Sequence, residues 1–207
     1  MEKVLGFIVG VTCVGVLVLW GMAPNEPAEI VAVAAPVTAD IPTGESQPLG
    51  RCPPDDLHLR CPAVLSAAQI DSILAAAGSP AAGIGGYWIE LGAAYNINPE
   101  IALAFFKHES SFGVDPNWAG IKPGGATTHN VGNLICAGYP TCYGRFRDYP
   151  SWKEGIEGWY QLIAVEYIGG RGHATVEDVI PVYAPAFEND VQNYIERVRQ
   201  QVKEWRM

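Results

Sequence analysis

The sequence predicts a mainly α-helical protein with one small irregular lobe, preceded by an apolar N-terminal segment and a linker. Hydrophobic residues recur at helical spacing in several segments after residue 65, and Gly, Pro, Asn and Thr interrupt this pattern between residues 115 and 149. Of the 207 residues, 49% are hydrophobic and 17% are charged, which is enough apolar material for a core. The net charge of −9 argues against nonspecific binding to nucleic acid.

Residues 4–23 form an uncharged run of 20 residues, long enough as a helix to cross the ~30 Å hydrocarbon layer of a bilayer. We therefore predict a membrane anchor over residues 1–23. The body of the chain is expected outside the cell, because Lys3 precedes the run and acidic residues follow it. The alternative is a cleaved signal peptide and a secreted protein. Gly6 and Gly10 have the GxxxG spacing that allows a weak dimer of membrane helices, or they are glycines without that role.

Residues 24–50 are rich in Pro, Ala and acidic side chains, which predicts a semi-extended linker to a folded domain over residues 51–207. Outside the apolar run the chain contains an even number of cysteines, as suits an exported protein: Cys52, Cys61, Cys136 and Cys142. We favour one disulfide between the first two and another between the last two, since each closes a short loop. A zinc site is the alternative, but neither pair has the C-x2-C spacing.

Three helices are predicted in the first half of the domain. Ser66 and Gln69 have the form of a capping box, and apolar residues follow at helical spacing. A second helix is expected over residues 86–95. Asn98 supplies an N-cap for a third helix, which begins with a proline and is expected to run to about Phe112.

Residues 115–149 are predicted to form the irregular lobe with a short hairpin. A further helix is predicted to begin at Ser151, and its apolar stripe reaches Tyr167. A short helix is expected over residues 175–182. The last helix is expected to be capped by Asn189 and to place an apolar stripe, which includes Tyr194, on the face that packs against the core.

Glu109 is the strongest candidate for chemistry, because it lies on the same apolar stripe as Ile101 and Phe105. Apolar surroundings and the negative end of the helix dipole both favour its protonated form. A protonated carboxyl near neutral pH is what a general acid needs. The alternative is a structural glutamate partnered by backbone groups or an arginine. No histidine pair has the HExxH spacing of zinc peptidases, and no metal or other cofactor is expected.

A set of short motifs appears in a fixed order along the domain. They are NPE at 98–100, ESSFG at 109–113, NVGNL at 130–134, FRDY at 146–149 followed by SW at 151–152, and YAP at 183–185 followed by END at 188–190. In their order and spacing, residues 66–205 resemble the bacterial endo-β-N-acetylglucosaminidase family of autolysins and flagellar wall-cutting enzymes. The resemblance implies a lysozyme-like fold, and peptidoglycan glycan strands as the substrate.

The resemblance also implies roles for individual residues. Glu109 would be the proton donor to the leaving glycosidic oxygen, and Tyr183 would lie close to it. Asn133 matches the asparagine of the segment that lines the site in the family. The remaining substrate contacts are expected from three residues within or near these motifs: Ser110, Tyr139 and Tyr149.

Glycoside hydrolysis usually needs a second carboxylate, and family members often carry it in the lobe. Asp115 is the better candidate there and Asp148 the alternative, while assistance by the substrate's N-acetyl group would remove the need for either. The expected function is an endo-β-N-acetylglucosaminidase. A muramidase or lytic transglycosylase on the same scaffold, and a wall-binding module without activity, are the alternatives.

Overall fold

The computed structural model describes residues 53–207 of the chain. The predicted anchor, the linker, the Gly6 and Gly10 pair and Cys52 lie outside the described residues. Within the described part, no helix combines the length and the apolar character needed to cross a membrane.

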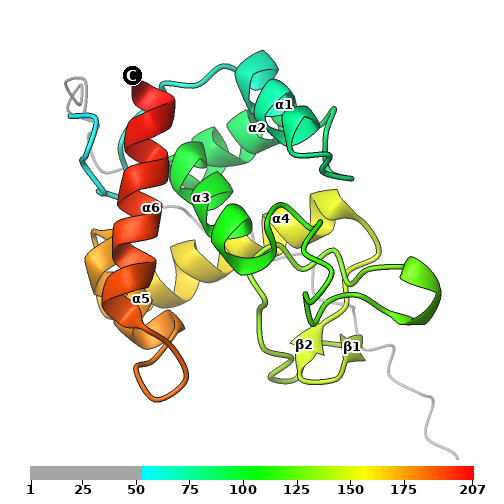
Figure 1. Cartoon of the computed structure of the whole chain (residues 1–207). Coiled ribbons are helices and arrows are strands. Elements are labelled where there is room, and N and C mark those ends of the chain that lie inside the picture. The colour runs from blue at the N-terminus through cyan, green and yellow to red at the C-terminus, as the bar shows by residue number, and fades with distance from the viewer. Residues whose placement is uncertain (1–52) are drawn as a thin grey trace, which may run out of the picture. The chain divides into compact units, whose positions relative to one another are not determined.

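The described domain is mainly α-helical, as the sequence predicts (Figure 1). Its elements in chain order are α1 (Ala67–Ala76), α2 (Gly85–Tyr95), α3 (Pro99–Ser110), the 3₁₀ turn η1 (Pro123–Gly125), β1 (Cys142–Tyr143), β2 (Phe146–Arg147), α4 (Trp152–Leu162), the π-helix η2 (Ile163–Gly169), α5 (Val176–Tyr183) and α6 (Val191–Arg206). The two strands form an antiparallel hairpin in which Cys142 lies opposite Arg147. This hairpin is the one that was expected in the lobe.

Helix α3 forms the centre of the core, because every residue from Pro99 to Phe106 is buried. Its start is the one predicted, since the Asn98 side chain accepts hydrogen bonds from the backbone amides of Glu100 and Ile101. Its end is not. The helix stops at Ser110 rather than at Phe112, because the backbone turns left-handed immediately afterwards, with φ of 50° at Ser111 and 62° at Phe112. Helix α6 packs along α3 (Figure 1).

Two other helix ends test the capping predictions. The capping box of Ser66 and Gln69 is present at the start of α1. The prediction that Asn189 caps the last helix is wrong, because the side chain of Asp190 accepts the bond from the Asn193 amide at 3.1 Å. Either residue type suits an N-cap, so the sequence alone did not discriminate between neighbours.

The lobe over residues 115–149 is held together by individual polar contacts rather than by a regular sheet. The Asn130 side chain accepts from the Leu134 amide at 2.8 Å and donates to the carbonyls of Leu134 and Arg147. Cys136 and Cys142 are joined as predicted, with Cα atoms 5.9 Å apart. Outside the lobe, Cys61 is also disulfide-bonded.

Two glycines on one face of α4 let the lobe approach the helix backbone. A Cβ at Gly155 would lie 1.7 Å from the carbonyl oxygen of His129, and a Cβ at Gly158 would lie 2.3 Å from the Tyr149 hydroxyl. No larger residue fits at either position without moving the lobe. The lobe is therefore set against α4 at a fixed distance, although it has little regular structure of its own.

Candidate active site

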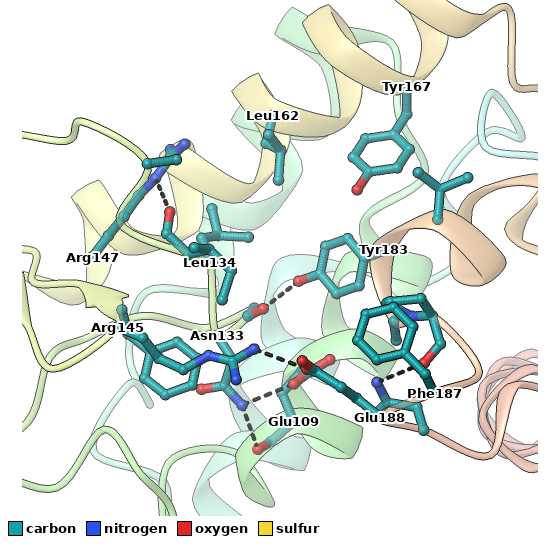
Figure 2. A pocket seen from close by; sticks show the side chains of 18 residues that line it. Glu109, Asn133, Leu134, Arg145, Arg147, Leu162, Tyr167, Tyr183, Phe187 and Glu188 are labelled. Atoms are coloured by element: carbon teal, nitrogen blue, oxygen red, sulfur yellow. Dashed lines mark hydrogen bonds and ion pairs between the residues drawn. The ribbon is translucent and has the colours of Figure 1, made fainter.

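A cleft of about 590 Å³ lies between the lobe, the C-terminal end of α3 and the segment that joins α5 to α6 (Figure 2). Glu109 reaches it from the last turn of α3, and Asn133 and Arg145 reach it from the lobe. Tyr183 comes from the end of α5, and Glu188 from the connection to α6. Residues far apart in the sequence thus converge on one cavity.

Glu109 is held by two neutral hydrogen-bond donors. The Tyr194 hydroxyl donates to Oε1 at 2.5 Å, and the Asn133 amide nitrogen donates to Oε2 at 2.8 Å. Burial raises the pKa of Glu109 from 4.5 to about 7, although both hydrogen bonds lower it. Near neutral pH the carboxyl can therefore hold a proton, release it and take it up again.

Asn133 is locked in place by its backbone and by three side-chain contacts. Its φ of 49° is left-handed, which asparagine tolerates better than most residues. Its Oδ1 accepts from the Trp118 indole at 2.6 Å, so its amide nitrogen points at Glu109, where it also donates to the backbone carbonyl at 3.1 Å. The structure thus places the Asn133 amide against the Glu109 carboxyl.

Tyr183 lines the cleft but does not bond Glu109. Its hydroxyl donates to the Gly132 carbonyl, and its ring packs edge-on against Phe105 at 5.2 Å. A Cβ at Gly132 would lie 2.4 Å from that hydroxyl, so a glycine is required there. Tyr183 consequently fixes the backbone that precedes Asn133.

Tyr194 is a site residue that the sequence analysis missed. It lies on the apolar stripe of α6, where it was read as a core residue, and its ring stacks on His108 at 3.6 Å. Burial raises the pKa of Tyr194 well above its usual range, so its hydroxyl remains a proton donor in the hydrogen bond to Glu109. A buried tyrosine hydroxyl needs a hydrogen-bond partner, and this requirement is the property from which a polar contact of Tyr194 could have been predicted.

The other predicted site residues are not part of the cleft lining. The Asp115 carboxylate accepts the Asn117 amide at 2.9 Å within its own turn. The Ser110 hydroxyl is buried and bonds the backbone of the α3 terminus. The Tyr139 and Tyr149 rings pack against one another in a tilted arrangement inside the lobe, with centroids 5.0 Å apart.

The structure adds two cleft residues from the connection between α5 and α6. Phe187 lines the cleft with a side chain that is 83% exposed, so its ring is accessible from solvent. Glu188 forms an ion pair with Arg145 at 2.9 Å, and this pair links the two walls of the cleft (Figure 2). Within residues 53–207, no group of three or more His, Cys, Asp and Glu side chains is arranged to hold a metal ion.

Comparison of the chain with protein families, curated proteins and solved structures gave no match.

Proposed function

We propose that the protein is a peptidoglycan hydrolase that cleaves β-1,4 glycosidic bonds of cell-wall glycan strands, as an endo-β-N-acetylglucosaminidase with a lysozyme-like fold. The observation that carries this proposal is the environment of Glu109. Its carboxyl faces an open cleft, has a pKa raised to about 7, and is bonded by two neutral donors instead of an arginine or lysine. These are the properties of a general acid for glycoside cleavage.

Each neighbour of Glu109 has a role in proton transfer. In the resting site the acid donates its proton to the leaving glycosidic oxygen as the C–O bond breaks. The resulting carboxylate keeps its hydrogen bonds from Tyr194 and Asn133, which stabilise the developing negative charge. The volume of about 590 Å³ is within the usual range for a ligand site, and the exposed Phe187 ring offers a face for a sugar.

The proposal includes the cellular location that the N-terminal sequence predicts. The domain would act outside the cell membrane, tethered through residues 1–50, or in the secreted form if residues 1–23 are a cleaved signal. In both forms its partner is the peptidoglycan strand.

The test is digestion of purified peptidoglycan, with mass spectrometry of the soluble products. A new reducing end on N-acetylglucosamine is expected. A reducing end on N-acetylmuramic acid would show a muramidase, and an anhydro sugar would show a transglycosylase. Binding to the wall without soluble fragments would contradict the enzymatic proposal.

The matched control is Glu109→Gln, which keeps the size of the side chain but cannot donate an acid proton. We expect a loss of activity of about 10² to 10⁴-fold with an unchanged fold. Circular dichroism and sedimentation of the variant with peptidoglycan would check folding and wall binding. Near-full activity in a folded variant would exclude Glu109 as the acid.

A further inference from the structure

The cleft contains a second carboxylate that no sequence argument assigned to catalysis. Among the described residues that line it, the acidic side chains are Glu109 and Glu188. They come from different walls, Glu109 from the end of α3 and Glu188 from the segment between α5 and α6. Their hydrogen-bond partners also differ, since Glu109 is held by Tyr194 and Asn133 and Glu188 by Arg145.

The two aspartates of the lobe are engaged elsewhere. Asp115 accepts a backbone amide within its own turn, at Asn117. Asp148 is bonded through both of its oxygens to Lys122, at 2.9 and 3.0 Å. Neither lines the cleft, so neither faces the place where Glu109 would protonate a glycosidic oxygen.

We propose that Glu188 is the second catalytic carboxylate, acting as the general base that activates the attacking water. This inference rests on the proposed glycosidase function. The ion pair with Arg145 holds the Glu188 side chain at the cleft, and a carboxylate is the form of the group that accepts a proton from water. Its side chain is 42% exposed, so water reaches it, whereas Glu109 is partly buried and favours its protonated form.

The reaction needs only these two carboxyl groups and one water molecule. Glu109 transfers its proton to the leaving oxygen while the glycosidic C–O bond breaks. A water held at Glu188 forms the new bond to the anomeric carbon and gives its proton to the Glu188 carboxylate. Exchange with solvent then restores both groups. Attack from the face opposite the leaving group inverts the anomeric carbon, so the first product is the α-anomer.

The experiment uses the full chain and soluble, peptide-free glycan strands. Glu188→Gln is expected to lower kcat by about 10² to 10⁴-fold. Glu188→Ala opens space for azide, a nucleophile that needs no base. We expect azide to restore cleavage in this variant and to produce an α-glycosyl azide, identified by mass spectrometry and nuclear magnetic resonance.

Arg145→Met is the matched control, because it removes the ion pair and keeps the carboxylate. Since the pair is exposed, the fold should tolerate either change. Because Arg145 positions the carboxylate but does not accept the proton, Arg145→Met is expected to lower kcat by less than Glu188→Gln does, and azide should not restore its activity. Equal losses in the Arg145 and Glu188 variants, without azide rescue, would show a structural pair and overturn the proposal.

The outcomes separate this inference from the proposed function. If Glu109→Gln is inactive while Glu188→Gln keeps wild-type kcat, the glycosidase stands and Glu188 is not its base. That result, or a β-anomer as the first product, overturns the role of Glu188 and favours substrate assistance or a retaining mechanism. If the wild type cleaves no glycan at all, the proposed function fails first.

Discussion

Helix α3 carries one glutamate near each end, and the groups that surround the two carboxyls differ in charge. Glu100, in the first turn, is fully buried and pairs with Arg206 at 3.0 Å, while its other oxygen accepts the amides of Val64 and Leu65. Glu109, in the last turn, receives only neutral donors and faces the cleft.

The difference lies in the charge of the groups that hold each carboxyl. At Glu100 a guanidinium compensates the charge, so the group ties the C-terminal helix to the start of the domain. At Glu109 neutral donors orient the carboxyl without a compensating cation, and burial then favours the protonated form. One residue type on one helix thus serves the fold at one end and is suited to chemistry at the other.

The largest expected effect is the removal of the structural glutamate. Glu100→Gln leaves the Arg206 charge buried without its partner, since the side chains of this pair are 0% and 2% exposed. We expect the free energy of unfolding to fall by about 3 to 5 kcal/mol, measured by urea denaturation at neutral pH. Glu196→Gln is the control, because it breaks an exposed pair with Arg199 and should cost less than about 1 kcal/mol. Equal effects would contradict the comparison.

The second prediction is that replacing Glu109 raises the free energy of unfolding, by an amount that depends on pH. Glu109 has a folded-state pKa of about 7 against 4.5 in the unfolded chain, so the folded state binds more protons between these values. Its contribution to stability is complete below 4.5 and is lost as the pH rises through 7. Glu109→Gln avoids this loss. It should be more stable than the wild type by on the order of 3 kcal/mol at about pH 8.

Urea denaturation of both proteins from about pH 4 to about pH 8 measures this difference. The difference in the free energy of unfolding between the two proteins should grow as the pH rises. A difference that stays constant over this range would mean that Glu109 is not a carboxyl with a raised pKa, and would remove the main support for its role as the acid.

Of these two glutamates, only Glu109 could be singled out from the sequence. The apolar stripe and the helix end identified Glu109, because helical periodicity is a local property of the chain. The partner of Glu100 is Arg206, at the other end of the domain, and no local pattern predicts a pair so distant. For the same reason Tyr194 was read as a core residue, although its hydroxyl is bonded to Glu109.

The lobe shows the same limit more strongly. Its Gly, Pro and Asn punctuation correctly predicted an irregular segment with a hairpin. Its internal geometry depends on single side chains such as Asn130, and on the fit of Tyr149 against Gly158. Periodicity carries no information about such contacts, and the predicted positions of Asp115 and Tyr139 at the site therefore had no local support.

The third prediction tests whether the lobe can be loosened separately from the helices. Cys136→Ser with Cys142→Ser opens a short loop, which should cost about 2 to 3 kcal/mol. The helical circular dichroism should remain, since the core around α3 does not include this bridge. Cleavage should fall by up to ~10²-fold, because the lobe positions Asn133 against Glu109. Unchanged kinetics in the double variant would show that the bridge does not order the site.

The smallest effect concerns the hydroxyl that α6 contributes to Glu109. The hydrogen bond from Tyr194 lowers the pKa of Glu109, so Tyr194→Phe should raise that pKa further. Because the acid must be protonated to work, the fall of kcat/KM at alkaline pH should move to higher pH in this variant. Tyr183→Phe is the control, since its hydroxyl bonds the Gly132 carbonyl instead, and the midpoint of its fall should stay in place whatever happens to the rate. An unmoved midpoint in Tyr194→Phe would mean that the group titrating in catalysis is not Glu109, and the pH profile would then have to be assigned to another group in the cleft.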